Sequence, residues 1–402
     1  MKIEIKPSRV CGSVAAPPSK SHVHRLLIAA ALADGESRIS GAADSEDISA
    51  TVDCLRALGA DVVRTAGGFS VRGCGGKPHA DGRTLPCRES GSTMRFLLPV
   101  SLIGGGAELS GSARLIERGV GVYRDLLVPR GVTFDIAPER VSVRGQLAGG
   151  NYEIPGGISS QFISGMLFAL PCAAEESRIT VTPPFESRAY VDMTLAALSR
   201  AGITVGRPSE REFIIPGGQK YKPFGATAEG DWSQAAFFLA LGGGVNVTGL
   251  DPDSLQGDRV CLTLLRQIAA GYTEAELSDC PDLAPVLFAA AAAAGHGAHF
   301  SGTRRLAIKE SRRADAMSEE LAKLGARLSV GEDTVDVAPG AIHAPREELS
   351  SHGDHRIVMA LAVCAVRVGG TIAGAEAVRK SYPDFFSELA KLGADIRVQK
   401  NA

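Results

Sequence analysis

The chain has 402 residues, of which 45% are hydrophobic and 22% are charged, so it can bury a large core and most simply forms two domains. Its formal net charge of −2 argues against binding of nucleic acid through bulk electrostatics, because proteins that bind in that way are usually basic. We therefore expect the cationic residues to act locally, at a site for a small anionic substrate.

The start of the chain and its longest apolar stretch favour a cytoplasmic protein. Met1–Lys6 alternates apolar and polar residues as a strand does, and it lacks the apolar core of a signal peptide. Pro285–Ala294 is alanine-rich and reaches only about half the length of a membrane span, so it predicts a buried helix. The 8 cysteines show no Cys-x-x-Cys pair, which indicates reduced thiols, and neither His22/His24 nor His352/His355 has a cysteine nearby to complete a zinc site.

A helix that ends in glycine and runs directly into a strand recurs along the chain. The glycines that end these helices are Gly59, Gly131, Gly202, Gly271, Gly325 and Gly393. Glycine at this place predicts a left-handed backbone that ends the helix. Neighbouring copies lie 54 to 72 residues apart, which is too long for the usual solenoids. The pattern therefore predicts an α/β protein of six small βαβ-type units, three to a domain.

Two points in the chain are expected to form the boundary between the domains. Glu229–Ser233 precedes an apolar helix after the third unit, and Pro17-Pro18 follows the first strands. One domain then comprises residues 19–228, and the other comprises residues 1–18 together with 229–402. Two connecting strands would permit closure of the domains with defined geometry.

Four short segments place cations beside hydroxyl or carboxyl groups. They are Pro17–Arg25, Lys309–Arg313, Gly353–Arg356 and Arg379–Asp384. A site that holds multiply anionic phosphates and also moves protons needs such neighbours.

These segments, together with the loops Glu89–Arg95 and Ser159–Phe162, resemble 5-enolpyruvylshikimate-3-phosphate (EPSP) synthases, in order and over nearly the whole chain. The resemblance implies two domains, each of three βαβαββ units around a pseudo-threefold axis, as an inside-out α/β barrel. It also implies transfer of the enolpyruvyl group of phosphoenolpyruvate to the 5-hydroxyl of shikimate 3-phosphate, on the route to chorismate and the aromatic amino acids. Neither a cofactor nor a metal is implied, and we expect a monomer with no nucleic-acid or membrane partner.

The resemblance assigns roles residue by residue. It implies that shikimate 3-phosphate is bound by Lys20, Ser21, Arg25, Ser159, Ser160, Gln161, Ser187, Arg188, Tyr190, Asp282 and Lys309. It implies that phosphoenolpyruvate is bound by Lys20, Gly91, Arg118, Gln161, Arg313, Arg356 and Lys380. The catalytic residues it implies are Asp282, which resembles the carboxylate that takes the 5-hydroxyl proton, and Glu310, Lys20 and Lys380. Which of Glu310 and Lys380 protonates the methylene carbon stays open.

Several positions admit another interpretation or depart from the family pattern. Asp282 could instead cap the apolar helix that follows it. Glu89 stands where asparagine is common, and Gly119–Gly121 occupies a loop where proline is common, which would make that loop more mobile. Arg312 replaces an aspartate, so the orientation of Arg313 is less secure than that of Arg356.

Three other functions compete with enolpyruvyl transfer to shikimate 3-phosphate. The related transferase that acts on UDP-N-acetylglucosamine typically has Lys-Asn in place of Lys20-Ser21 and a cysteine near Arg118. A catalytically silent binding protein of the same fold would have lost one or more of the catalytic residues, yet all four are present. An RNA-end-processing relative would need a nucleotide site and a nucleophilic histidine, and the chain is not basic.

The resemblance also implies inhibition by glyphosate. This inhibitor occupies the phosphoenolpyruvate subsite of the family, where a side chain larger than that of Gly91 would crowd it.

Overall fold

The structure is a computed structural model that describes residues 1–399. Contacts divide the chain into two compact units. The first domain is Pro18–Glu229, and the second consists of Met1–Pro17 together with the chain from Gly230 onward. Among the described residues, no helix combines the length and the apolar character that a membrane crossing requires.

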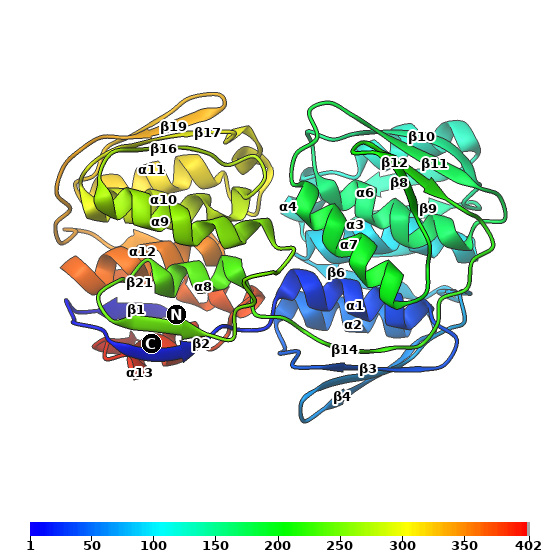
Figure 1. Ribbon diagram of the computed structural model, residues 1–402, viewed down its shortest axis with the longest axis horizontal. Helices are drawn as coiled ribbons and strands as arrows, with labels where there is room; N and C mark the ends of the chain where they lie inside the picture. The colour runs from blue at the N-terminus through cyan, green and yellow to red at the C-terminus, as the bar shows by residue number, and fades with distance from the viewer. Residues whose placement is uncertain (400–402) are drawn as a thin grey trace. The chain divides into compact units, whose positions relative to one another are not determined.

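The first domain holds three four-stranded sheets (Figure 1). In spatial order the strands are β14 (Gly225–Thr227), β3 (Glu36–Ser40), β5 (Gly68–Arg72) and β4 (Asp61–Thr65); β6 (Thr84–Arg88), β7 (Gly106–Gly111), β9 (Arg140–Arg144) and β8 (Thr133–Ala137); and β10 (Gly150–Pro155), β11 (Ser177–Thr182), β13 (Glu212–Ile215) and β12 (Gly206–Ser209). In each sheet the first pair is parallel and the other pairs are antiparallel. Parallel neighbours need a crossover helix and antiparallel neighbours can be joined by a hairpin, which gives the βαβαββ order.

Helices fill the space inside these sheets (Figure 1). The α-helices of the first domain are α1 (Lys20–Leu32), α2 (Glu46–Ala57), α3 (Gly91–Ser101), α4 (Ala113–Glu117), α5 (Gly121–Leu127), α6 (Ser160–Ala169) and α7 (Arg188–Arg200), and its 3-10 turns are η1 (Leu102–Gly104), η2 (Val128–Arg130) and η3 (Leu170–Cys172). Helices α1, α3 and α6 are buried on nearly all sides, which is why their sequences are apolar almost throughout. They form the centre of the first core.

The second domain has two four-stranded sheets and one pair of strands among the described residues. These are β16 (Thr273–Glu276), β17 (Ala298–Ser301), β19 (Thr334–Val337) and β18 (Leu328–Val330); β20 (Leu349–Ser350), β21 (Gly370–Ala373), β1 (Lys2–Ile5) and β22 (Ile396–Gln399); and β15 (Val245–Thr248) with β2 (Gly12–Ala15). The predicted N-terminal strand is confirmed: β1 lies between β21 and β22 and is antiparallel to both. The six sheets formed by residues 1–399 confirm the predicted α/β fold of six units.

The helices of the second domain also lie inside its sheets (Figure 1). They are α8 (Trp232–Leu239), α9 (Cys261–Ala270), α10 (Ala284–Ala294), α11 (Arg313–Lys323), α12 (His355–Val368) and α13 (Phe385–Lys391), with the 3-10 turns η4 (Gly257–Val260), η5 (Pro281–Leu283), η6 (Arg304–Ile308) and η7 (Ala375–Lys380). The predicted buried helix is α10, and most of α12 is buried beside it. Both helices begin close to the polar residues of the candidate site.

One of the six glycine helix ends was predicted wrongly. Five of the glycines have φ between 73° and 104°, as expected for left-handed helix ends. Gly271 instead has φ of 165°, an extended conformation, because the chain leaves α9 and runs directly into β16 of the next sheet. The unit of β2, α8, β15 and α9 thus lacks the antiparallel strand pair that closes the other five units, which is a hairpin in four of them and β22 with β1 in the fifth. The missing hairpin also explains why Gly271 and Gly325 are only 54 residues apart in the sequence, the shortest separation between neighbouring glycines of the six.

Candidate active site

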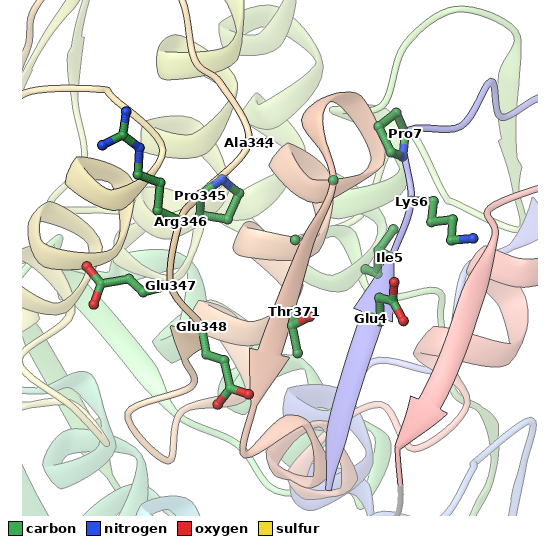
Figure 2. Close-up of a pocket in the computed structure, with 12 residues that line it drawn as sticks. Glu4, Ile5, Lys6, Pro7, Ala344, Pro345, Arg346, Glu347, Glu348 and Thr371 are labelled. Carbon is green, nitrogen blue, oxygen red and sulfur yellow. The ribbon is translucent and has the colours of Figure 1, made fainter.

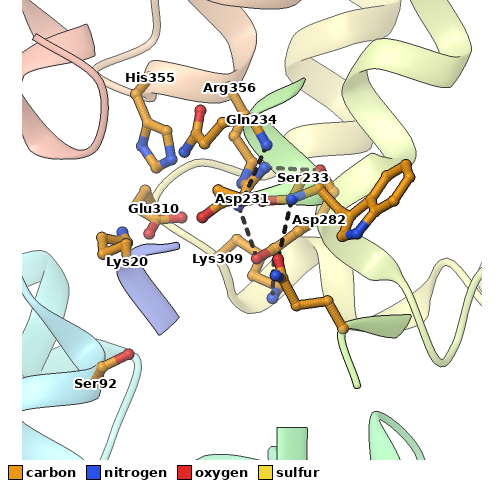
Figure 3. A network of polar contacts seen from close by, with 12 residues as sticks. Lys20, Ser92, Asp231, Ser233, Gln234, Asp282, Lys309, Glu310, His355 and Arg356 are labelled. Atoms are coloured by element: carbon orange, nitrogen blue, oxygen red, sulfur yellow. Dashed lines mark hydrogen bonds and ion pairs between the residues drawn. The ribbon is translucent and has the colours of Figure 1, made fainter. Parts of the chain in front are cut away.

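Asp282 lies at the centre of a polar network in the second domain (Figure 3). It sits in η5, and its Oδ1 accepts hydrogen bonds from Lys309 Nζ at 3.1 Å and Arg313 Nη1 at 2.8 Å. Its Oδ2 accepts one from Arg356 Nη2 at 3.0 Å. Burial by itself raises the pKa of this carboxyl, but the charges of Arg356, Lys309 and Arg313 outweigh burial and hold the pKa well below its usual value.

Arg313 connects three carboxylates from three segments of the chain. Besides Asp282, it binds Glu310 through Nη2 at 2.6 Å and Asp354 through Nε at 2.8 Å. Its side chain is only 1% exposed, and Asp354 is fully buried. Asp354 also accepts a hydrogen bond from the backbone N–H of Arg356 and so caps α12. Arg313 therefore fixes the start of α12 relative to η5.

Two alternative expectations for this region were wrong. Arg312 does not disturb Arg313, because its own side chain is exposed and pairs with Asp315 at 2.5 Å. Asp282 does not cap α10, since the residue at that position is Leu283 and the Asp282 carboxylate binds the basic residues instead.

Arg356 is also held by the first turn of α8, which the sequence did not point to. Its Nη2 donates to Ser233 Oγ at 3.0 Å, and Ser233 in turn donates to Asp231 Oδ1 at 2.7 Å. Asp231 caps α8 through the N–H of Gln234 at 2.9 Å. The Gln234 side-chain amide, beside Arg356 in Figure 3, is buried and has no hydrogen-bond partner among the described residues. A signal existed in the sequence, since Asp231-Trp232-Ser233 has the form of a helix start.

Two lysines complete the group in the second domain. Burial lowers the pKa of Lys309 to about 8, although Asp282 favours the charged form. Lys380, at the end of η7, donates from Nζ to the carbonyl oxygen of Gly353 at 2.7 Å. Gly353 directly precedes Asp354, so Lys380 is attached to the segment that leads into α12.

In the first domain, Lys20 and Ser21 form the first turn of α1. Ser19 caps this helix. Lys20 Nζ donates to Asp47 Oδ2 at 2.6 Å, and both side chains are largely buried. The Ser21 carbonyl oxygen accepts from Arg25 Nη1 at 2.7 Å. Asp47, which holds the Lys20 ammonium, was not found from the sequence.

Arg25 points into the first domain. Its Nε donates to Thr194 Oγ1 at 2.8 Å and its Nη2 to the Tyr190 carbonyl oxygen at 2.9 Å. The guanidinium also lies 5.2 Å from the centre of the Phe96 ring. Burial lowers the pKa of Arg25 to about 10. Arg25 thus joins α1 to α7, and its contact with a substrate stays a prediction.

Gly91, Arg118 and Gln161 meet around a residue that the assignment omitted, Arg95. Arg95 donates from Nη1 to Gln161 Oε1 at 2.6 Å and from Nη2 to the Arg118 carbonyl oxygen at 2.8 Å. Gln161 Nε2 donates to Ser92 Oγ at 3.0 Å. A Cβ atom on Gly91 would lie 3.1 Å from Arg118 Nη2. Glycine at this position therefore leaves room for the Arg118 guanidinium.

The three predicted phosphate-binding serines lie at helix starts. Ser159 caps α6, and Ser160 is its first residue. Ser187 precedes α7 with φ of 55°, a conformation that non-glycine residues rarely adopt. Arg188 follows it and pairs with Glu210 at 2.8 Å. The starts of α6 and α7 present backbone N–H groups of the kind that bind phosphate.

Each domain thus gathers its own share of the assigned residues. In the second domain, direct contacts join Asp282, Lys309, Glu310, Arg313 and Arg356. In the first domain, contacts join Ser21 to Arg25 and Tyr190, and Gln161 to Arg118 through Arg95.

A cavity of about 440 Å³ in the second domain lies apart from this network (Figure 2). It is lined by Glu4, Ile5, Lys6, Pro7, Ala344, Pro345, Arg346, Glu347, Glu348, Gly369, Gly370 and Thr371. Its lining holds three carboxylates against two basic side chains, so it does not suit a multiply charged anion.

Comparison with known proteins agrees with the motifs. The family model described as EPSP synthase (3-phosphoshikimate 1-carboxyvinyltransferase) matches residues 5–389. The 3-phosphoshikimate 1-carboxyvinyltransferase of Clostridium kluyveri is 38% identical, and the match covers 98% of each chain. The enzyme of that name from Clostridium perfringens is 37% identical, with 98% of this chain and 99% of the relative covered. The chain belongs to the EPSP synthase family.

A solved EPSP synthase supports the fold as well. The structure of EPSP synthase from Acinetobacter baumannii matches with a TM-score of 0.80, over 99% of this chain and 100% of that chain. At 24% sequence identity, this similarity shows the fold alone. Membership of the EPSP synthase family confirms the resemblance found in the sequence motifs.

Proposed function

We propose that the protein transfers the enolpyruvyl group of phosphoenolpyruvate to the 5-hydroxyl of shikimate 3-phosphate and releases phosphate. Family membership over nearly the whole chain supports this reaction. The observation that carries it in the structure is Asp282, a largely buried carboxylate bound by three basic residues. Such a group suits proton removal from a hydroxyl beside anionic substrates.

The reaction itself requires an acid, a base and several cations. The methylene carbon of the enol is protonated to a methyl group while the hydroxyl gives up its proton and attacks the adjacent carbon. The tetrahedral intermediate then loses one methyl proton together with phosphate, which restores the double bond. The two substrates bring roughly five or six negative charges together, and two unit charges about 4 Å apart interact by about 4 kcal/mol at an effective dielectric of 20. Arginine can offset this repulsion because its planar group binds phosphate or carboxylate through two parallel hydrogen bonds.

We assign to Asp282 the removal of the 5-hydroxyl proton. With its pKa held well below the usual value, it is charged but weakly basic in the free protein. The negative charges of phosphoenolpyruvate would attract the guanidinium groups of Arg313 and Arg356. These groups would then stabilise the Asp282 carboxylate less than they do in the free protein. The pKa of Asp282 would rise toward the range of an effective base when the substrate is present.

We assign proton delivery and phosphate binding to the neighbouring lysines and Glu310. Lys309, with its pKa near 8, can bind the shikimate hydroxyls or give up a proton at modest cost. Glu310 and Lys380 are the two candidates for protonation of the methylene carbon. Lys20, at the start of α1, is proposed to contact both substrates.

We assign shikimate 3-phosphate mainly to the first domain. The starts of α6 and α7 offer Ser159, Ser160 and Ser187 to its phosphate, with Arg188 and Tyr190 nearby in sequence. Residues of the second domain supply much of the phosphoenolpyruvate site. We further propose that the protein acts in the cytoplasm as a monomer, and the free cysteines agree with a reducing compartment.

The decisive experiment measures phosphate release from phosphoenolpyruvate with and without shikimate 3-phosphate. We expect release only when both are present, and a loss of about 100-fold to 10,000-fold in kcat for Asp282→Asn, as is typical for removal of a general base. Lys20→Ala should also abolish most of the release. Release that does not depend on shikimate 3-phosphate, or that needs UDP-N-acetylglucosamine, would refute the proposed acceptor.

A further inference from the structure

Glu320 is a fully buried acidic residue that neither the sequence motifs nor the assigned roles include. It lies on α11, seven residues after Arg313, and residues seven apart share one face of a helix. Arg313 binds Asp354 from this face. Glu320 binds residues that precede Asp354 in the chain. Ser350 N donates to Glu320 Oε2 at 2.8 Å, and His352 Nε2 lies 2.8 Å from Glu320 Oε1. One face of α11 therefore contacts both ends of the segment 350–354.

The Glu320 carboxylate is well compensated at this buried position. Lys323 Nζ donates to Oε1 at 2.9 Å and to Oε2 at 3.0 Å. Together with the bonds from Ser350 and His352, both oxygens are occupied. A buried carboxylate is tolerated only when such partners are present, so it holds these partners in place in return.

The same carboxylate does not make a metal site. Ligand atoms of Glu319, Glu320 and His352 lie within 4.8 Å of one another. The Lys323 ammonium, however, already supplies a positive charge to both oxygens of Glu320. The cluster is better explained by its effect on the segment that it holds.

The segment that Glu320 holds is an unusually shaped turn. His352 has φ of 47°, although it is not glycine, and Gly353 follows with φ of 66°. Non-glycine residues adopt this conformation only where the surroundings hold them in it. Here the His352 N–H donates to Ser350 Oγ at 3.2 Å, and its ring is fixed by Glu320.

This turn binds one of the residues assigned to phosphoenolpyruvate, Lys380, and leads into the helix that holds another, Arg356. The Gly353 carbonyl oxygen accepts from Lys380 Nζ at 2.7 Å. Asp354 starts α12, and Arg356 in the first turn of α12 binds Asp282. A shift of the turn would move both Lys380 and Arg356.

We propose that Glu320 and His352 are positioning residues that set the places of Lys380 and Arg356 for binding of phosphoenolpyruvate. The proposal rests on the proposed function for the identity of the substrate. Glu320 and His352 touch no substrate in it and act only through the turn at 352–353. Both residues would therefore affect the affinity for phosphoenolpyruvate although they lie outside the binding motifs.

The first test compares the Michaelis constants of Glu320→Gln and His352→Asn with those of the control Glu319→Gln. Asparagine tolerates the left-handed conformation but is too short to reach Glu320 in place of histidine. The control removes one charge next to Glu320 and leaves the contacts of Glu320 intact, since the Glu319 carboxylate reaches His352 Nε2 only at 4.0 Å. We expect a KM for phosphoenolpyruvate about 5-fold to 20-fold higher in both test variants, a nearly unchanged KM for shikimate 3-phosphate, and wild-type constants in the control.

A merely structural role predicts a different pattern. It would reduce the amount of folded enzyme, and hence the apparent kcat, without raising one Michaelis constant selectively. An unchanged KM for phosphoenolpyruvate in both variants, or an equal rise for both substrates, overturns the proposal.

The second test does not depend on activity. Amide hydrogen exchange of the peptide that contains residues 350–354 is measured in wild type, Glu320→Ala, His352→Asn and the Glu319→Gln control. We expect exchange about 10-fold faster in Glu320→Ala and His352→Asn than in the control, because the turn loses its attachment to α11. If Glu320→Ala does not fold, His352→Asn gives the answer, and wild-type exchange in a folded variant overturns the proposal. If the wild type releases no phosphate, the proposed function fails, while this exchange still tests whether Glu320 and His352 hold the turn.

Discussion

Arg313 illustrates how one buried side chain can serve both structure and binding. Its guanidinium balances Asp282, Glu310 and Asp354, and its side chain is almost inaccessible. Burial alone raises the pKa of Asp354, but the Arg313 charge keeps it below its usual value. Loss of Arg313 would remove one positive partner from all three carboxylates, so a variant at this position would confuse effects on folding with effects on substrate binding.

Gly91 offers a cleaner residue for testing the phosphoenolpyruvate subsite. Gly91→Ala places a Cβ 3.1 Å from Arg118 Nη2, so the guanidinium must move. We expect the KM for phosphoenolpyruvate and the inhibition constant of glyphosate both to rise, by about 10-fold if roughly 1.4 kcal/mol of binding is lost. Steady-state kinetics with and without glyphosate measures both constants.

Gly121→Ala is the matched control for Gly91→Ala. Gly121 begins α5, close to Arg118 in sequence, and a Cβ there would meet nothing within 4 Å. Its constants should equal those of the wild type. An unchanged glyphosate inhibition constant in Gly91→Ala would contradict the placement of the subsite.

At this scale the sequence predicts residues that lie within motifs and misses those that support them. Asp282, Arg313 and Arg356 were all assigned through the resemblance of their segments to EPSP synthases. Ser233 and Asp47 were not, because each is brought to its partner by the packing of one helix against another, α8 against α12 and α2 against α1. Local patterns carry no information about such contacts.

The helix ends show the same limit at the scale of elements. A glycine after an amphipathic helix predicts a left-handed turn only if the chain then reverses direction into a strand of the same sheet. Gly325 meets this condition, whereas Gly271 leads straight into the next sheet. The two glycines have similar sequence surroundings, and the difference arises from a hairpin that one unit lacks.

Alanine at these two glycines should therefore have opposite effects. Gly325 has φ of 88°, and a Cβ there would lie 2.5 Å from His343 Nε2, so Gly325→Ala should lower the free energy of unfolding by about 1 to 2 kcal/mol. Gly271→Ala meets nothing within 4 Å and has an extended backbone, so it should be neutral or stabilise by about 0.4 to 1 kcal/mol. Urea unfolding of both variants beside the wild type checks the pair, and an equal loss in both would mean that Gly271 is left-handed after all.

The whole molecule combines two domains whose buried ionisable groups differ. In the first domain, burial lowers the pKa of His22 to about 4, and the nearby charges of Arg200 and Arg25 act in the same direction. Burial also lowers the pKa of His24, whose Nδ1 lies 2.8 Å from Thr51 Oγ1. In the second domain the groups with lowered pKa include Asp282 and Asp354. Histidines and aspartates lose their stabilising effect in different ranges of pH.

We expect acid to unfold the first domain before the second. The folded-state pKa of His22 lies below its unfolded value of 6.5, so its contribution is complete above pH 6.5 and falls as the pH drops toward 4. The loss is about 2 kcal/mol at pH 5 for His22 alone, and His24 adds to it. Asp282 and Asp354 begin to lose their contribution only near the unfolded pKa of about 3.9, so they protect the second domain at pH 5. Hydrogen exchange at pH 7 and pH 5, corrected for the intrinsic rates, should show lower protection at pH 5 in Pro18–Glu229 but not from Gly230 onward. His22→Gln should reduce that loss, and equal losses in both domains would contradict the expectation.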